Sequence, residues 1–287
     1  MKGSIGVATF SRAEYLDKCI SSIVRAKGLR DIPLLVLHQL GDSEVKQVIS
    51  KWRSHIFLLI ELNPIGKSAL QNINLNSILL RHTAFNFMDS DWFLGVEEDV
   101  EIGGDSIKFI ESMMTRYISK RAFRGVNLGS NLPRVNISES HYCRMRYGMQ
   151  GQASAITRQT WEKFNFDRLV KNSSWSALDG MMENHLKSGF MCNPLLSRYL
   201  DNGWGGTHGL GDPSHEFYRK LENSFIDLPE KNVFEYFENK VRIPLRKDAI
   251  LYNPQFTLFY IIKNNLSYWY FTTINRWFKI LRIKLTF

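Results

Sequence analysis

Short apolar runs alternate with amphipathic stretches along the first hundred residues. The runs 5–10 and 33–38 are typical of buried strands, and between them Tyr15, Cys19 and Ile23 recur at the spacing of one helical face. A strand, a helix and a second strand in this order form a unit whose two strands run parallel. We therefore expect an α/β fold built on a mainly parallel sheet.

The same alternation continues to residue 118 and then becomes less regular. We expect helices at 44–52, 68–87 and 105–118, strands at 55–62 and 92–96, then short strands at 126–129 and 153–157 and helical pieces at 161–164 and 178–186. No internal repeat or low-complexity linker interrupts this region. The second half is therefore expected to complete the same domain.

The charge of the chain is concentrated at its end. Of the formal net charge of +9, the segment 257–287 carries five cations and no acid, which leaves +4 for the other 256 residues. That is mild for a domain of this size and argues against nucleic-acid binding. Three cysteines without CxxC spacing indicate a reducing compartment and no structural zinc. The first strand begins without the features of a signal peptide, which favours the cytoplasm.

Three acids, Glu97, Glu98 and Asp99, directly follow the apolar run 92–96. Neighbouring carboxylates repel one another, so they are tolerated best where a cation or a basic ligand binds. The alternative is that these acids only end the strand and turn into solvent. In open α/β sheets, however, ligands bind at the carboxyl ends of strands. Five residues are expected to lie just beyond such ends and to share one rim: Ser11, Arg12, Gln39, Asp42 and Asp99.

Residues 5–12, Ile-Gly-Val-Ala-Thr-Phe-Ser-Arg, resemble the opening of nucleotide-sugar glycosyltransferases with the GT-A fold, and Glu97-Glu98-Asp99 resembles their acidic metal motif. The more specific resemblance is to N-acetylglucosaminyltransferase I and its relatives. Glu97-Glu98-Asp99-Val100-Glu101 matches their acidic motif, with Glu98 in place of an aspartate. Further matches, spread between residues 5 and 217, include Lys67, Gln71, Pro194, Ser197-Arg198 and Thr207-His208-Gly209.

This resemblance implies a GT-A fold, Rossmann-like, with a mostly parallel central sheet flanked by helices. Together with the basic, aromatic composition of the tail, it indicates a glycosyltransferase domain at 1–250 and a C-terminal helical extension at 251–287. Within the domain, 1–100 is the expected nucleotide-binding half and 101–250 the expected acceptor and catalytic half.

The resemblance also implies roles for three acids. Asp99 matches the ligand of the metal ion, Mn2+ or Mg2+, and Glu97 or Glu98 would assist it through water. Asp179 matches the catalytic base, although the tryptophans that flank the base in the family are missing here. Glu183, one helical turn further on, is the reserve candidate for the base.

Further positions are expected to bind the nucleotide. Arg12 suits the base or a phosphate of a UDP-sugar, the alternative being a surface arginine at a helix start. Asp42 suits the uracil N–H, the alternative being a helix cap before Glu44. Lys67 matches a family lysine, and His208 suits the diphosphate or metal, the alternative being a plain surface residue.

Two segments have a composition of their own. The stretch 203–211 contains five glycines in nine residues, which suits a lid over a bound nucleotide. In the tail, apolar residues share one face of a helix and cations lie on the other, as in a helix that binds an anionic membrane surface. The apolar face carries Ile274, Trp277, Phe278, Leu281 and Leu285, and the cations are Arg276, Lys279 and Arg282. The alternative is a helix packed on the core or on a partner.

We therefore expect a metal-dependent, inverting glycosyltransferase that moves a sugar, with GlcNAc favoured, from a UDP-sugar to a hydroxyl of a glycan acceptor. A lipid-linked glycan suits a protein peripheral on the inner face of the cell membrane, as in bacterial surface polysaccharide assembly. The alternative is a catalytically silent GT-A relative that binds glycans or acts as a scaffold at the membrane.

Overall fold

The computed structural model describes residues 1–28, 31–66, 68–129, 141–145, 152–163, 189–203 and 237–238. All of them belong to the first of the two units into which the chain divides, Met1–Lys240. Six predicted features lie outside the described residues: Lys67, the helical piece at 178–186, Asp179 with its reserve Glu183, His208, the glycine-rich stretch beyond Gly203, and the tail 251–287.

Nine strands of the described residues form one sheet in the order β11-β7-β9-β6-β8-β4-β1-β2-β3. Five of its eight pairings are parallel, including those that join β4, β1, β2 and β3. A separate two-stranded sheet pairs β10 with β5. The strands are β1 (Gly3–Thr9), β2 (Leu34–Gln39), β3 (Leu58–Leu62), β4 (Trp92–Glu97), β5 (Val100–Ile102), β6 (Phe123–Asn127), β7 (His141–Met145), β8 (Ala153–Thr157), β9 (Phe190–Pro194), β10 (Tyr199–Asp201) and β11 (Phe237–Glu238).

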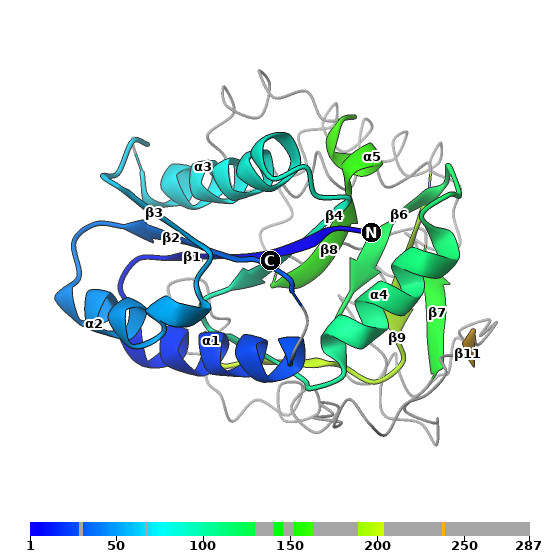
Figure 1. The fold of residues 1–287 in the computed structure, drawn as a ribbon, viewed down its shortest axis with the longest axis horizontal. Helices are drawn as coiled ribbons and strands as arrows, with labels where there is room; N and C mark the ends of the chain where they lie inside the picture. The colour runs from blue at the N-terminus through cyan, green and yellow to red at the C-terminus, as the bar shows by residue number, and fades with distance from the viewer. Residues whose placement is uncertain are drawn as a thin grey trace, which may run out of the picture. The chain divides into compact units, whose positions relative to one another are not determined.

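Helices cover both faces of this sheet (Figure 1). They are α1 (Ala13–Lys27), α2 (Ser43–Lys51), α3 (Ala69–His82), α4 (Ser106–Tyr117) and α5 (Arg158–Trp161), with a short 3-10 helix η1 (Arg53–His55) and a π-helix η2 (Thr83–Phe87). One core lies under α1, α2 and α4, and a second lies under α3, η2 and α5. Alternate residues of the strands serve the two cores: Val7 and Val36 face α1, whereas Leu37 and Phe93 face α3. Strands buried on both faces explain the continuous apolar runs of the sequence.

The expected α/β fold with a mostly parallel central sheet flanked by helices is confirmed. The helix expected at 68–87 divides into α3 and η2. The strand expected at 55–62 begins later, at Leu58, because His55 belongs to η1. The strand expected at 126–129 is β6, which begins earlier, at Phe123.

The order of the strands reverses between β1 and β4. The chain adds β2 and β3 on one side of β1 and then returns to place β4 on the other side. Ala8 is in register with Glu97, so the carboxyl ends of these parallel neighbours lie together. Ligands of open α/β sheets bind outside the carboxyl ends of the strands at such a reversal of strand order.

Within the described residues, every helix is too short or too polar to span a membrane.

Candidate active site

Arg12, Glu98 and Asp99 meet beyond the carboxyl ends of β1 and β4. Arg12 is the N-cap residue of α1, but its side chain makes no cap bond. Its guanidinium Nη1 pairs instead with Oδ2 of Asp99, and its Nε lies 3.8 Å from Oε1 of Glu98. The side chains of Asp99 and Glu98 are only 12% and 16% exposed. The structure thus brings the first strand end and the acidic motif into one mostly buried charged cluster.

Glu98 ties the acidic motif to the loop after β1. The backbone N–H of Phe10 donates to its Oε2 at 3.0 Å. Burial raises the pKa of the Glu98 carboxyl and the charge of Asp99 adds to this, whereas hydrogen bonds and the nearby Arg12 act to lower it. The net effect is a pKa above the ordinary value, which the hydrogen bonds and Arg12 limit.

A third carboxylate, Asp201, joins this cluster from a distant part of the chain. It is the last residue of β10, which pairs with β5 so that Asp201 lies opposite Val100, the residue after Asp99. The backbone N–H of Asn202 donates to the backbone carbonyl oxygen of Asp99 at 2.8 Å. The N–H of Gly203 donates to Oδ1 of Asp201, also at 2.8 Å.

Gly203 shows how closely the two aspartates approach each other. A Cβ atom built on Gly203 would lie 2.3 Å from Oδ2 of Asp99 and 3.0 Å from Oδ1 of Asp201. Both carboxylates therefore lie within 3.0 Å of one point, and only a residue without a side chain fits there. Burial raises the pKa of the Asp201 carboxyl and the charge of Asp99 raises it further, whereas the Gly203 N–H and Arg12 lower it. The opposite effects of Asp99 and Arg12 on the pKa of Asp201 are those expected when two neighbouring carboxylates lie near one cation.

The described part of this cluster has more negative than positive charge. It contains three carboxylates, those of Glu98, Asp99 and Asp201, and one guanidinium, that of Arg12. The described residues contain no group of three histidine, cysteine or acidic side chains arranged to hold a metal ion on their own. The oxygen donors of Asp99 and Asp201 nevertheless fit Mg2+ or Mn2+, which proteins commonly hold through one or two carboxylates together with substrate phosphates.

Cys19 of α1 is an uncharged, buried residue that contacts the acidic motif. Its thiol is fully buried and donates to the backbone carbonyl oxygen of Glu97 at 3.5 Å. Burial raises the pKa of the Cys19 thiol well above its ordinary value, and the carboxylates of Asp99 and Glu98 raise it further. The Cys19 thiol therefore remains protonated and adds no further negative charge to the site.

Arg198 anchors the segment that carries Asp201. Its side chain is 1% exposed and its Nε donates to Oδ2 of the fully buried Asp105 at 2.8 Å. Its guanidinium also lies over the ring of Phe109 of α4, 4.8 Å from the ring centroid. The N–H of Gly103 donates to the backbone carbonyl oxygen of Arg198 at 2.9 Å. The arginine of the Ser197-Arg198 match thus joins the start of β10 to α4 and to the end of β5.

The described residues give no evidence that the remaining predicted site residues join this cluster. Asp42 is the N-cap of α2, and its Oδ1 accepts from the N–H groups of Glu44 and Val45 at 2.8 and 3.1 Å. The cap interpretation is confirmed, and the contact with uracil stays a prediction. Glu97 ends β4 with its side chain exposed. Lys67, Asp179 and His208 lie outside the described residues.

Substituting Asp42 separates its two predicted roles. We expect Asp42→Ala to lower the free energy of unfolding by about 1 kcal/mol, because α2 loses its cap. Asp42→Asn keeps a capping oxygen and should retain stability in urea unfolding. If Asp42 also accepts from uracil, both variants bind UDP more weakly than the unchanged chain. An Asp42→Asn chain with unaltered UDP affinity would leave the cap as its only role.

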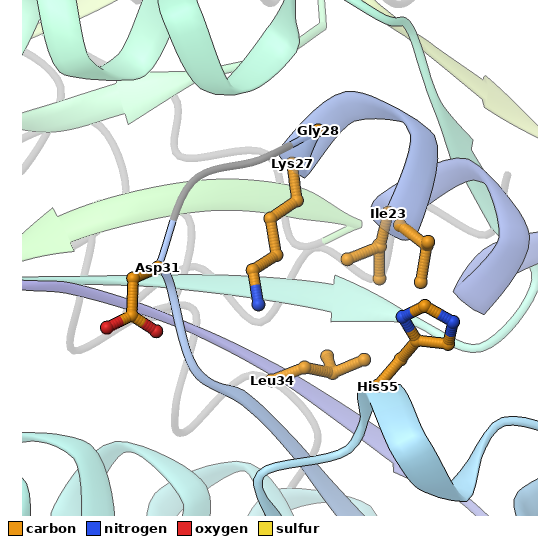
Figure 2. Close-up of a pocket in the computed structure, with 7 residues that line it drawn as sticks. Ile23, Lys27, Gly28, Asp31, Leu34 and His55 are labelled. Atoms are coloured by element: carbon orange, nitrogen blue, oxygen red, sulfur yellow. The ribbon is translucent and has the colours of Figure 1, made fainter.

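A pocket lies at the other end of the parallel strands from the acidic cluster. It has a volume of about 230 Å³ and is lined by Ile23, Val24, Lys27, Gly28, Asp31, Leu34 and His55. Figure 2 shows the side chains of Lys27, Ile23 and His55 directed into this space above Leu34. Leu34 begins β2, so the pocket lies at the amino end of the parallel strands. None of the predicted site residues lines it, and the candidate site is therefore the acidic cluster at the carboxyl ends.

No protein-family model matches this sequence, and no similar curated protein was found. Among solved structures, residues 1–349 of TarS from S. aureus align over 81% of this chain and 74% of that chain, at 13% identity and a TM-score of 0.49. The same TarS segment in complex with UDP aligns over 80% and 68%, at 11% identity and a TM-score of 0.47. The mannosyltransferase PcManGT from Pyrobaculum calidifontis, in complex with GDP-Man and Mn2+, aligns over 69% and 57%, at 14% identity and a TM-score of 0.42. These similarities are similarities of fold, and the UDP, GDP-Man and Mn2+ belong to the structures of the proteins named.

Proposed function

We propose that this protein is a metal-dependent glycosyltransferase of the GT-A type that uses a UDP-sugar as donor. The observation that supports this most is the meeting of Asp99, Asp201 and Arg12 outside the carboxyl ends of β1 and β4, where the strand order reverses. This position provides carboxylate oxygens for a divalent cation and a guanidinium for a phosphate within one small region.

The charges of this cluster suit the departure of a nucleoside diphosphate. Cleavage of the bond between sugar and diphosphate leaves negative charge on the leaving group. A divalent cation bound at Asp99 and Asp201 would supply charge stabilisation there without a proton transfer. Arg12 orients the diphosphate, because its planar fork matches the geometry of phosphate oxygens.

The acceptor hydroxyl needs a base, because a neutral hydroxyl is a weak nucleophile. We assign that role to Asp179, as the resemblance implies, with inversion at the sugar carbon. The acceptor proposed is a glycan hydroxyl, and the donor sugar favoured is GlcNAc. The basic, aromatic tail would hold the protein peripherally on the inner face of the membrane, where a lipid-linked glycan is within reach.

Titration calorimetry of the full chain with UDP-, GDP-, CMP- and dTDP-sugars, with Mn2+ and with chelator, tests the donor class. We expect binding of a UDP-sugar in the presence of Mn2+ and a clear loss of that binding with chelator. Binding of another nucleotide class would replace the assigned donor. Failure of every nucleotide sugar to bind would favour the alternative of a catalytically silent glycan-binding or scaffold protein.

A further inference from the structure

Arg12 occupies the side of Asp99 that a metal ion would need. The guanidinium pairs with Oδ2 of Asp99, the same oxygen that lies closest to the Cβ position of Gly203. One side of this oxygen is thus closed by the chain at Gly203 and another by Arg12. The Asp99 side chain is 12% exposed, which leaves little room for a second cation beside the guanidinium.

A divalent cation and a guanidinium bound to the same mostly buried carboxylate oxygen repel each other. Once a diphosphate is present, the guanidinium of Arg12 can pair with its phosphate oxygens instead of with Asp99. Its side chain is long, 29% exposed, and projects from the N-cap position of α1, where the helix N-terminus favours an anion. Phosphate oxygens accept the two parallel hydrogen bonds of the guanidinium as well as a carboxylate does.

We propose that Arg12 is a resident counter-ion that keeps the metal ion from Asp99 until a nucleoside diphosphate draws the guanidinium away. Metal and nucleotide then bind interdependently, since each removes an obstacle to the other. This inference rests on the proposed function, because it assumes that the cluster binds a divalent cation and a diphosphate. It goes further by making Arg12 an inhibitor of metal binding in the free protein as well as a phosphate ligand.

The affinity for Mn2+ alone distinguishes this role from simple phosphate binding. The test measures free Mn2+ by electron paramagnetic resonance in solutions of the full chain, without and with UDP. We expect Arg12→Gln to bind Mn2+ alone at least about fivefold more tightly than the unchanged chain. The increase in Mn2+ affinity on adding UDP should be smaller in this variant than in the unchanged chain. If Arg12 only contacts phosphate, Arg12→Gln would lower the affinity for UDP and leave the affinity for Mn2+ alone unchanged.

Two matched variants control for charge and for folding. Lys18→Gln removes one positive charge from the same helix, but Lys18 pairs with the exposed Glu14 at 2.8 Å and not with the cluster. This variant should bind Mn2+ as the unchanged chain does. Arg12→Lys keeps the charge without the fork and should bind Mn2+ alone less tightly than Arg12→Gln.

The outcomes separate this inference from the function on which it rests. If Mn2+ binds in the presence of UDP but Arg12→Gln does not raise the affinity for Mn2+ alone, the counter-ion role is wrong and the metal-dependent function stands. An equal rise in Lys18→Gln would likewise overturn the role of Arg12, because general charge would explain it. If Mn2+ binds to none of these chains, with or without UDP, the metal-dependent function itself fails.

Discussion

Replacing Asp99 with alanine should abolish the Mn2+-dependent binding of the UDP-sugar and lower the rate of sugar transfer by at least about a hundredfold. Asp99 is the member of the acidic motif that contacts both Arg12 and the Gly203 turn, so its carboxylate is central to the cluster. Without it, Asp201 would have to hold the cation alone, and Arg12 would lose the partner that positions it. Calorimetry with Mn2+ and a UDP-sugar measures the first effect, and a turnover assay measures the second.

The exposed Glu14 provides the control for this prediction. Glu14→Ala also removes one carboxylate near the start of α1, but its partner is Lys18 on the surface. We expect this variant to keep both metal-dependent binding and turnover. Thermal unfolding of both variants checks that the fold is retained. Full metal-dependent transfer by Asp99→Ala would show that the metal site lies elsewhere.

Replacing Arg198 with methionine should lower the free energy of unfolding by about 3–5 kcal/mol, the usual result of leaving one buried charge without its partner. Arg198 and Asp105 are 1% and 0% exposed and lie 2.8 Å apart, so solvent cannot compensate for the loss. Urea unfolding of the full chain measures this effect. Because Arg198 begins the segment that leads to Asp201, the affinity for Mn2+ in the presence of UDP should fall as well.

A paired substitution tests the cause of that instability. Arg198→Met combined with Asp105→Leu removes both charges and leaves apolar side chains of similar volume. Buried ion pairs exchanged in this way often lose little stability, so we expect the double variant to recover most of the loss. A double variant as unstable as Arg198→Met would show that the packing of Arg198 on Phe109, rather than its charge, is decisive.

The fold was predictable where one physical pattern dominated. The strands β1, β2 and β4 are buried on both faces and therefore appear as short apolar runs, and α1 shows its buried face through Cys19 and Ile23. Element boundaries were less predictable. The run before β3 looks continuous from His55, yet the chain makes a 3-10 turn there before it becomes extended.

Asp201 could not be found from the sequence for a different reason. It belongs to no motif, and it reaches Asp99 only because β10 pairs with β5. Such a pairing depends on register between distant segments, and local patterns do not reveal it. The glycine at position 203 was the available indication, since a residue without a side chain is needed where two segments of the chain come very close. Arg198 was noted only as a match to a family motif, and the structure supplies the reason for it: a buried partner, Asp105.

The pairing of β5 with β10 has a consequence for how the protein is made. Asn202 donates to Oε1 of Glu101 at 2.9 Å across 101 residues of sequence. During synthesis the parallel strands β1 to β4 emerge long before β10, and contacts between such distant segments form only after the long loop between them has closed. A nascent or truncated chain that ends before Tyr199 therefore contains the whole acidic motif but not Asp201 or the Gly203 turn. We therefore expect the proposed activity only in chains that have been synthesised beyond Gly203.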